Sequence, residues 1–177
     1  TYLKHNPSKN ISVLVALYSI LEEAVTTLNF VFETSILCEN DISIKWNIKP
    51  HPLTNKHKLT GLTDHPFPDN WTWMDGDFHE CLDKVDILIG SASSTCLEAI
   101  ARGRFVLLIG NRHGLTHNSI PSTIPKDLWQ LSYTYKDAAK AIKSYSNNNN
   151  MQLITDNIRT DFFEPITNDN VNNLVKL

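Results

Sequence analysis

Short runs of apolar and β-branched residues alternate along this chain with longer segments of helical periodicity. The apolar runs at residues 11–17, 42–48, 71–74, 87–89, 105–109 and 128–133 predict strands. Apolar positions three or four residues apart predict helices at 21–38, 77–85, 95–102 and 137–145, with closing helices at 151–163 and 170–177. Between the second and third strands, the segment 53–70 is rich in Pro, Asp, Thr and His and predicts an extended loop.

This alternation predicts an α/β fold. We expect a Rossmann-like, doubly wound, mainly parallel six-stranded sheet with helices on both faces, because parallel strands need crossover helices. In the usual strand order 3-2-1-4-5-6, ligands bind beside the carboxyl ends of the first and fourth strands. Residues 1–10 are predicted to be a polar linker and residues 11–177 a single domain. Because the chain has no initiator Met, we expect it to be a fragment of a longer protein.

Composition is that of a soluble globular domain, with 41% hydrophobic and 20% charged residues in 177. A net charge of −3 argues against a nucleic-acid partner, so an anionic ligand would have to be bound by local groups. The three cysteines lie in apolar segments, which predicts reduced core thiols and a cytoplasmic location. The apolar run at 11–20 is too short to cross a membrane.

A cluster of hydroxyl side chains follows the fourth predicted strand and begins the next helix. Ser91, Ser93, Ser94 and Thr95 lie where the first N–H groups of a helix have no partners within it. A phosphate there would gain charge-assisted hydrogen bonds and a favourable helix dipole. Alternatively, Thr95 and Glu98 match a capping box, which would explain those two residues but not the serines. The cluster therefore predicts a phosphate site.

Cationic and polar side chains follow two further strands. Lys49 and His51 lie at the end of the second strand, with His51 held between two prolines. A protonated imidazole there could neutralise a phosphate or assist a departing oxygen, although a rigid strand exit is an alternative explanation. Asn111, Arg112 and His113 follow the fifth strand, where they would be useful to an anionic ligand or form a solvated loop.

Other known motifs are absent or have structural explanations. The Asp75-Gly76-Asp77 segment could bind a metal, but we expect a turn in which Asp77 caps a helix and Glu80 completes a capping box. The histidines show no tight metal-ligand spacing, so no metal or cofactor is expected. The sequence lacks the glycine-rich dinucleotide motif, the Walker phosphate loop and the Gly-x-Ser-x-Gly elbow.

The segment Lys49-Pro50-His51-Pro52, followed by residues 89–103, resembles the C-terminal donor domain of GT-B glycosyltransferases of the bacterial surface-polysaccharide type. Bacterial sialyltransferases, polysialyltransferases and CDP-glycerol polymerases similarly pair a His-Pro motif with a Ser-Ser or Ser-Thr motif. The resemblance implies that His51 attends the leaving group and that Glu98 holds the ribose of a nucleotide-sugar. It also implies that Ser93, Ser94 and Thr95 bind the donor phosphate. The loop at 111–113 would approach the nucleotide or the sugar.

GT-B enzymes have two Rossmann-like domains, and this chain has the length of one. The resemblance therefore implies a missing N-terminal domain that supplies the catalytic base and meets a glycan or lipid-linked acceptor. Peripheral membrane association of the full-length protein is a further expectation, and the fragment alone should bind nucleotide with little or no turnover. Two alternatives remain open: an isomerase similar to UDP-sugar 2-epimerases, and a non-catalytic nucleotide-binding module.

Overall fold

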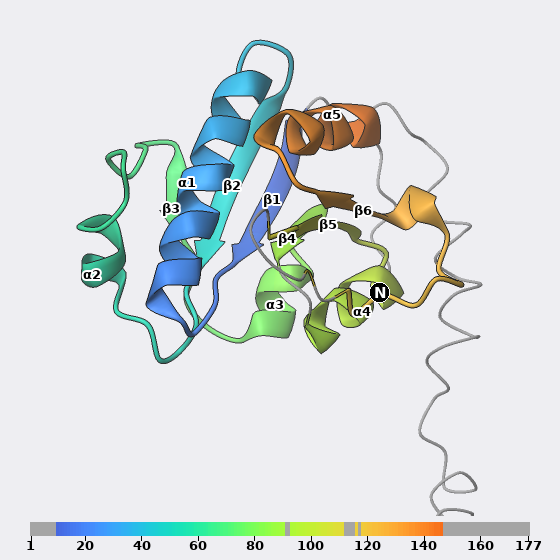
Figure 1. The fold of residues 1–177 in the computed structure, drawn as a ribbon, viewed down its shortest axis with the longest axis horizontal. Helices are drawn as coiled ribbons and strands as arrows, with labels where there is room; N and C mark the ends of the chain where they lie inside the picture. The colour runs from blue at the N-terminus through green and yellow to red at the C-terminus, as the bar shows by residue number, and fades with distance from the viewer. Residues whose placement is uncertain (1–9, 91–92, 112–115, 117, 147–177) are drawn as a thin grey trace, which may run out of the picture.

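The computed structural model describes residues 10–90, 93–111, 116 and 118–146 (Figure 1). In chain order the elements are β1 (Asn10–Ala16), α1 (Leu21–Cys38), β2 (Ser43–Lys49), α2 (Lys56–Thr60), β3 (Trp71–Trp73), α3 (Phe78–Leu82), β4 (Ile87–Gly90), α4 (Ser94–Ala101), β5 (Phe105–Ile109), the 3₁₀ turn η1 (Lys126–Leu128), β6 (Trp129–Ser132) and α5 (Tyr135–Ser146). Strand β1 begins at Asn10, the last residue of the predicted linker. Residues 1–9 and the predicted closing helices lie outside the described residues.

The six strands form one parallel sheet in the order β3-β2-β1-β4-β5-β6, which confirms the predicted fold class and strand order. Strand β1 is central, because Val15 pairs with Ile48 of β2 on one side and with Ile89 of β4 on the other. The chain builds outward from β1 in one direction and then in the other, so the switch point lies between β1 and β4.

Helices cover both faces of the sheet, as predicted. Figure 1 shows α1 and α5 on one side of the strands and α3 and α4 on the other. An ion pair between Lys143 of α5 and Asp41, just after α1, joins the two helices of the first side. Helix α4 packs on the opposite side, against β4 and β5. This arrangement follows from right-handed crossovers, which place helices on opposite faces when the direction of strand addition reverses.

Because both faces are covered, β4 and the second half of β1 are continuous apolar runs rather than alternating ones. Val13, Leu14 and Val15 of β1 are completely buried. All three cysteines are free and buried in this core, which confirms the prediction of core thiols. Burial raises the pKa of Cys38 and of Cys96 to about 11, so both stay protonated at neutral pH. No helix in the described part of the chain is long and apolar enough to span a membrane.

A partly buried polar network links β1 to the middle of β2 and to the residue before β4. Asp86 is 7% exposed, and its Oδ2 accepts a hydrogen bond from the Ser12 backbone N at 2.7 Å. Asn47 Nδ2 donates to Ser12 Oγ and to the Val13 carbonyl, both at 3.0 Å. Because a buried polar group is costly without its partner, this network fixes the relative register of β1, β2 and β4.

The segment predicted to be an extended loop is instead partly helical. Asn55 caps α2, and its side-chain oxygen accepts from the backbone N of His57 at 2.9 Å and of Lys58 at 3.3 Å. Helix α2 has five residues, too few to show a helical period, so the composition of 53–70 concealed it.

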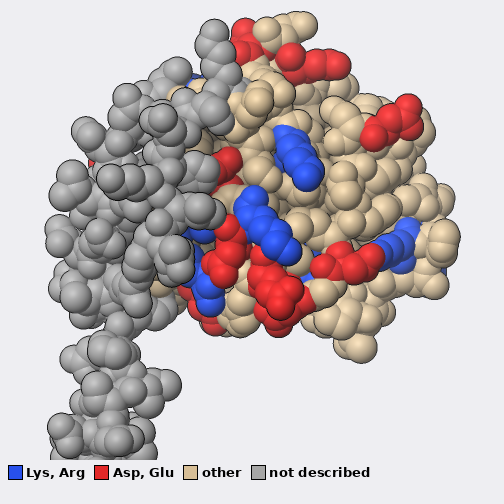
Figure 2. All heavy atoms as spheres, turned by 180° about the vertical axis from the view of Figure 1, so that it is seen from behind, with Lys and Arg blue, Asp and Glu red and all other residues tan. Residues whose placement is uncertain are grey.

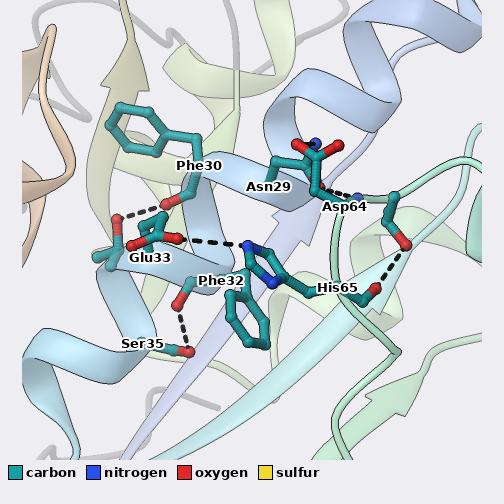
Figure 3. Close-up of polar contacts among 9 residues, drawn as sticks. Asn29, Phe30, Phe32, Glu33, Ser35, Asp64 and His65 are labelled. Atoms are coloured by element: carbon teal, nitrogen blue, oxygen red, sulfur yellow. Dashed lines mark hydrogen bonds and ion pairs between the residues drawn. The ribbon is translucent and has the colours of Figure 1, made fainter.

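The chain between α2 and β3 is attached to α1 rather than free (Figure 3). The His65 ring stacks on Phe32 with centroids 4.0 Å apart, and His65 Nε2 lies 3.3 Å from Glu33 Oε1. Asn29 exchanges two hydrogen bonds with Asp64, through the side-chain amide and the Asp64 backbone N. These contacts hold the approach to β3 against the outer surface of α1.

Charged side chains of both signs are interspersed on the described part of the face shown in Figure 2. Several of the cations are paired with carboxylates, such as Arg102 Nη1 with Asp83 Oδ1 at 2.7 Å and Lys56 with Asp75. Lysine and arginine side chains on this described face are therefore mixed with carboxylates rather than gathered into one basic patch.

Candidate functional site

The predicted site residues follow strands that end at the same edge of the sheet. Lys49 of β2 lies opposite Ala16 of β1. On the other side of β1, Gly90 is the last residue of β4, and a Cβ at Gly90 would lie 4.0 Å from the Ala16 Cβ. The end of β2, which leads to His51, and the end of β4, which leads to Ser93, therefore lie on either side of β1. Two strand spacings separate them, which is about 10 Å.

Helix α4 begins at this edge with Ser93 as its N-cap. The Ser93 backbone is extended, and its Oγ accepts from the Thr95 backbone N at 3.4 Å. The alternative explanation of Thr95 and Glu98 as a capping box is therefore wrong, because the N-cap is Ser93, two residues before Thr95. Ser119 Oγ donates to the Ser93 carbonyl at 3.1 Å and holds the cap from the segment before η1.

The hydroxyl groups of the predicted cluster differ in their surroundings. Ser94 is exposed, while Ser93 and Thr95 are half-buried. Ser91 lies outside the described residues. The first turn of α4 thus presents backbone N–H groups and an exposed hydroxyl at the switch point, which are donors suited to an anion.

His51 is half-buried and held by a turn of its own segment. Its carbonyl accepts from the Thr54 backbone N at 2.8 Å, and its Nδ1 accepts from the Leu53 backbone N at 3.3 Å. A neutral imidazole that accepts at Nδ1 carries its hydrogen at Nε2. The turn therefore fixes the ring and leaves Nε2 as a hydrogen-bond donor.

Lys49 was predicted to contact a phosphate, but in the structure its side chain bonds to the backbone. Its Nζ donates to the carbonyl of Gly76 at 2.6 Å, between β3 and α3. Gly76 has a φ of +92°, a conformation that glycine adopts without strain. Nearby, Lys56 forms an ion pair with Asp75. We call residues 74–77 the β3–α3 loop, and these two lysines hold it against β2 and α2.

Asp77 caps α3, as predicted, by accepting from the backbone N of His79 at 2.8 Å and of Glu80 at 3.3 Å. These hydrogen bonds lower the pKa of Asp77, because they stabilise the carboxylate. Within the described part of the chain, no group of three or more His, Cys, Asp or Glu side chains is placed to hold a metal ion. The Asp75-Gly76-Asp77 segment therefore forms a turn and a helix cap here.

Glu98 lies in α4 and contacts a residue that sequence reasoning missed. Its Oε2 is 3.5 Å from Nδ1 of His79, in the first turn of α3. A single histidine on a five-residue helix shows no periodicity or metal spacing, so no sequence signal distinguished it. The capping-box interpretation also directed attention away from this contact, because it paired the Glu98 carboxylate with a backbone N–H of its own helix.

The segment after β5 closes on itself. The Asn111 backbone N donates to Thr116 Oγ1 at 2.9 Å. Arg112 and His113 lie outside the described residues. Beside this segment, the Tyr133 ring packs so closely on Gly110 that an added Cβ would come within 2.5 Å of two ring carbons. Tyr133 is 44% exposed and adds an aromatic surface at this edge that we did not predict.

Tyr18 follows β1, at the centre of the same edge, and was also missed. Its carbonyl accepts from Thr54 Oγ1 at 3.2 Å, which links the segment after β1 to the turn that contains His51. Burial, with smaller contributions from Glu23 and Cys96, raises the pKa of Tyr18 to about 12. Its hydroxyl is therefore a neutral group at physiological pH.

No protein-family model matches the chain, and no curated protein matches it. Solved structures do match. CalG4, the calicheamicin glycosyltransferase, aligns with a TM-score of 0.61 and 15% identity over 86% of this chain and 38% of its own. TarM aligns with a TM-score of 0.63 and 14% identity over 96% of this chain and 35% of its own. The glycotransferase of kitacinnamycin aligns with a TM-score of 0.55 and 10% identity over 91% and 41%.

The chain shares its Rossmann-like α/β fold with part of each of these GT-B glycosyltransferases. It spans between 35% and 41% of the length of these three proteins, which is less than half of a GT-B enzyme. The likeness lies in the arrangement of strands and helices, since 10 to 15% of the aligned residues are identical. The GT-B sheet places His51 and the first turn of α4 on either side of β1.

Proposed function

We propose that this chain is the donor-binding domain of a glycosyltransferase that takes a sugar, or a related unit, from a nucleotide-activated donor. The observation that carries the proposal is the N-terminus of α4, which opens at the switch point of a GT-B sheet. Surface-polysaccharide synthesis is the role we propose for the full-length protein, on the strength of the Lys49-Pro50-His51-Pro52 and serine motifs.

The chemistry of glycosyl transfer explains what such a site must do. As the bond to the sugar breaks, negative charge grows on the departing phosphate, and groups already in place stabilise it best. The first N–H groups of α4 and the hydroxyls of Ser94 and Thr95 would bind this phosphate. His51 would donate from Nε2 to the departing oxygen, since Nδ1 is occupied by the Leu53 backbone N. The helix dipole and these donors supply the stabilisation, so we propose no metal or cofactor.

The remaining predicted residues complete the proposal. Glu98 would accept hydrogen bonds from the ribose hydroxyls of the nucleotide, because a carboxylate binds hydroxyl groups and repels phosphate. Lys49, Ser91, Asn111, Arg112 and His113 stay predictions as further contacts to the donor. Lys49 Nζ already donates one hydrogen bond to the Gly76 carbonyl, so its other N–H groups would be the ones that contact the donor.

We place the catalytic base and the acceptor site on a second domain, because the chain spans only part of each GT-B protein it matches. The acceptor would be a glycan or a lipid-linked saccharide. A cytoplasmic location with peripheral attachment to the membrane would suit such an acceptor. The domain alone would bind its donor nucleotide and turn over little or none of it.

Titration of the isotope-labelled chain with CMP, CDP, UDP and GDP, followed by NMR, tests the proposal. One of the four should bind weakly and shift the amide signals of Ser93, Ser94 and His51. The variant Ser94→Ala should weaken binding, because it removes an exposed hydroxyl from the first turn of α4. Ser146→Ala is the matched control, since that serine ends α5 and bonds to its own helix. A folded chain in which none of the four nucleotides shifts these signals would contradict the proposal.

An assay of the full-length protein separates transfer from the alternatives. Transfer requires an acceptor, so a nucleotide-sugar should be consumed only when the acceptor is present. Epimerisation of a UDP-sugar without any acceptor would instead show an isomerase. Binding without turnover across a panel of acceptors would show a nucleotide-binding module.

A further inference from the structure

The contact between His79 and Glu98 is a polar bridge between α3 and α4 at the rim of the candidate site. His79 Nδ1 lies 3.5 Å from Glu98 Oε2, and the two side chains are 48% and 39% exposed. Among the described residues, His79 is the side chain that the Glu98 carboxylate contacts. Both side chains are exposed enough to contact a ligand, and their mutual contact limits the rotamers that each can adopt.

His79 is itself held in place from three directions. Asp77 caps α3 and accepts a hydrogen bond from the His79 backbone N at 2.8 Å. The β3–α3 loop that precedes it is tied to β2 by Lys49 and to α2 by Lys56. The Phe78 ring packs edge-on against the imidazole, with centroids 6.0 Å apart. The backbone of His79 is therefore held in place where its imidazole reaches toward α4.

From this geometry we propose that His79 is a positioning residue for Glu98, and that it aims the carboxylate at the hydroxyl groups of a bound ribose. The inference rests on the proposed function, because it assumes that a nucleotide binds beside the first turn of α4. A carboxylate has two oxygens, and His79 engages Oε2. Oε1 then remains available to accept from a ligand hydroxyl.

The physical gain is preorganisation. A free glutamate side chain populates several rotamers, and binding must select one of them at a loss of entropy. The contact with His79 makes this selection before the ligand arrives, so more of the hydrogen-bond energy appears as affinity. His79 thereby acts on the ribose through Glu98 and does not need to contact the nucleotide.

The test takes whichever of CMP, CDP, UDP and GDP binds in the titration and compares it with its 2′,3′-dideoxy form on the chain and two variants. His79→Ala should bind the ribonucleotide about fivefold more weakly, as expected for the loss of one oriented hydrogen bond. The dideoxy form has no ribose hydroxyls for Glu98 to hold, so its affinity should not change. His79→Asn should restore ribonucleotide binding, because its Nδ2 lies near the position of the imidazole Nδ1.

Each other outcome identifies what has failed. If none of the four nucleotides binds the original chain, the proposed function and this inference both fail. If one binds and His79→Ala binds it as tightly, the inference is wrong and the proposed function stands. Equal weakening of the ribose and dideoxy forms would show a purely structural role for His79 and would also overturn the inference. Circular dichroism and thermal unfolding of each variant verify that it is folded.

Discussion

His51 illustrates how the backbone can set the chemical state of a side chain. The Leu53 backbone N occupies Nδ1, so a neutral imidazole presents Nε2–H as a donor. Two prolines flank the residue and limit the backbone conformations available to it. The result is a donor of known orientation at a strand exit, which a solvent-exposed loop histidine would not provide.

His51→Asn should weaken binding of the nucleotide identified by titration about fivefold without destabilising the chain. An asparagine Oδ1 can accept from the backbone N two residues later and so preserve the turn, but it cannot replace the Nε2 donor. Calorimetric titration gives the affinity, and thermal unfolding gives the stability. Unchanged affinity in a folded variant would remove His51 from the site.

The close contact between Gly110 and Tyr133 gives a second prediction for single residues. Gly110→Ala should lower the free energy of unfolding by about 1–3 kcal/mol, because the added Cβ collides with the Tyr133 ring. In a Tyr133→Ala background the same substitution should cost much less. Urea unfolding of the four chains measures this coupling. Equal costs in both backgrounds would show that the collision is not the cause.

At the scale of elements, the short helices depend on their caps. Helix α3 has five residues, and the Asp77 side chain supplies acceptors for two of its first backbone N–H groups. Helix α4 uses Ser93 in the same way. A helix this short gains little from its own backbone hydrogen bonds, so capping and packing determine whether it forms.

The lowered pKa of Asp77 makes its contribution to stability dependent on pH. A carboxyl whose pKa is lower in the folded state stabilises the fold above its ordinary pKa of 3.8, and that stability is lost as the pH falls through the folded value. The original chain should therefore melt higher than Asp77→Asn at pH 6, and the gap should narrow below pH 4. Asp77→Ala should melt lower than both at pH 6. A gap that is constant across this range would contradict the charge effect.

Strand positions were the most predictable elements, because β1 is mostly apolar and β4 entirely so, as expected for strands covered on both faces. The alternation of strands with helices predicted the parallel sheet, and the strand order was expected as the usual one for doubly wound sheets. Helix α2 was missed because a five-residue helix has no period to detect. Its start depends on Asn55, which is as common in turns as at helix ends.

The candidate site was predictable where it follows from strand ends and was not predictable where it depends on side-chain partners. His51, Ser93 and Ser94 lie at the edge that the strand order implies. The partners of Lys49 and Glu98 come from the β3–α3 loop and from α3, and contacts between such distant segments leave no local pattern. Tyr18 and Tyr133 were missed because isolated aromatic residues are ordinary on any surface.

In the whole molecule, the two edges of the sheet have different roles. Asp86 and Ser12, near the amino-terminal edge, form a hydrogen-bond network with Asn47 in the middle of β2, whereas the carboxyl-terminal edge presents exposed polar groups. The first arrangement stabilises the fold and the second is available to a ligand. Because the sheet separates them, substitutions at the two edges should act independently.

Asp86→Ala should lower the free energy of unfolding by about 1–3 kcal/mol, because the partly buried Ser12 backbone N loses its acceptor. The affinity of the folded chain for the nucleotide should not change. Asp86→Asn keeps an acceptor oxygen and should recover part of the stability. Urea unfolding and calorimetric titration on the same samples measure both quantities. A large loss of affinity per folded molecule would show that the two edges are coupled.

The outermost strands are short, with three residues in β3 and four in β6, while the inner strands β1 and β2 have seven each. A long outer strand would offer a row of unpaired backbone groups to any other chain that approached it. In this sheet the outer strands expose too few unpaired backbone groups to pair stably with another strand. The short outer strands thus disfavour edge-to-edge pairing between molecules, which is a route to aggregation.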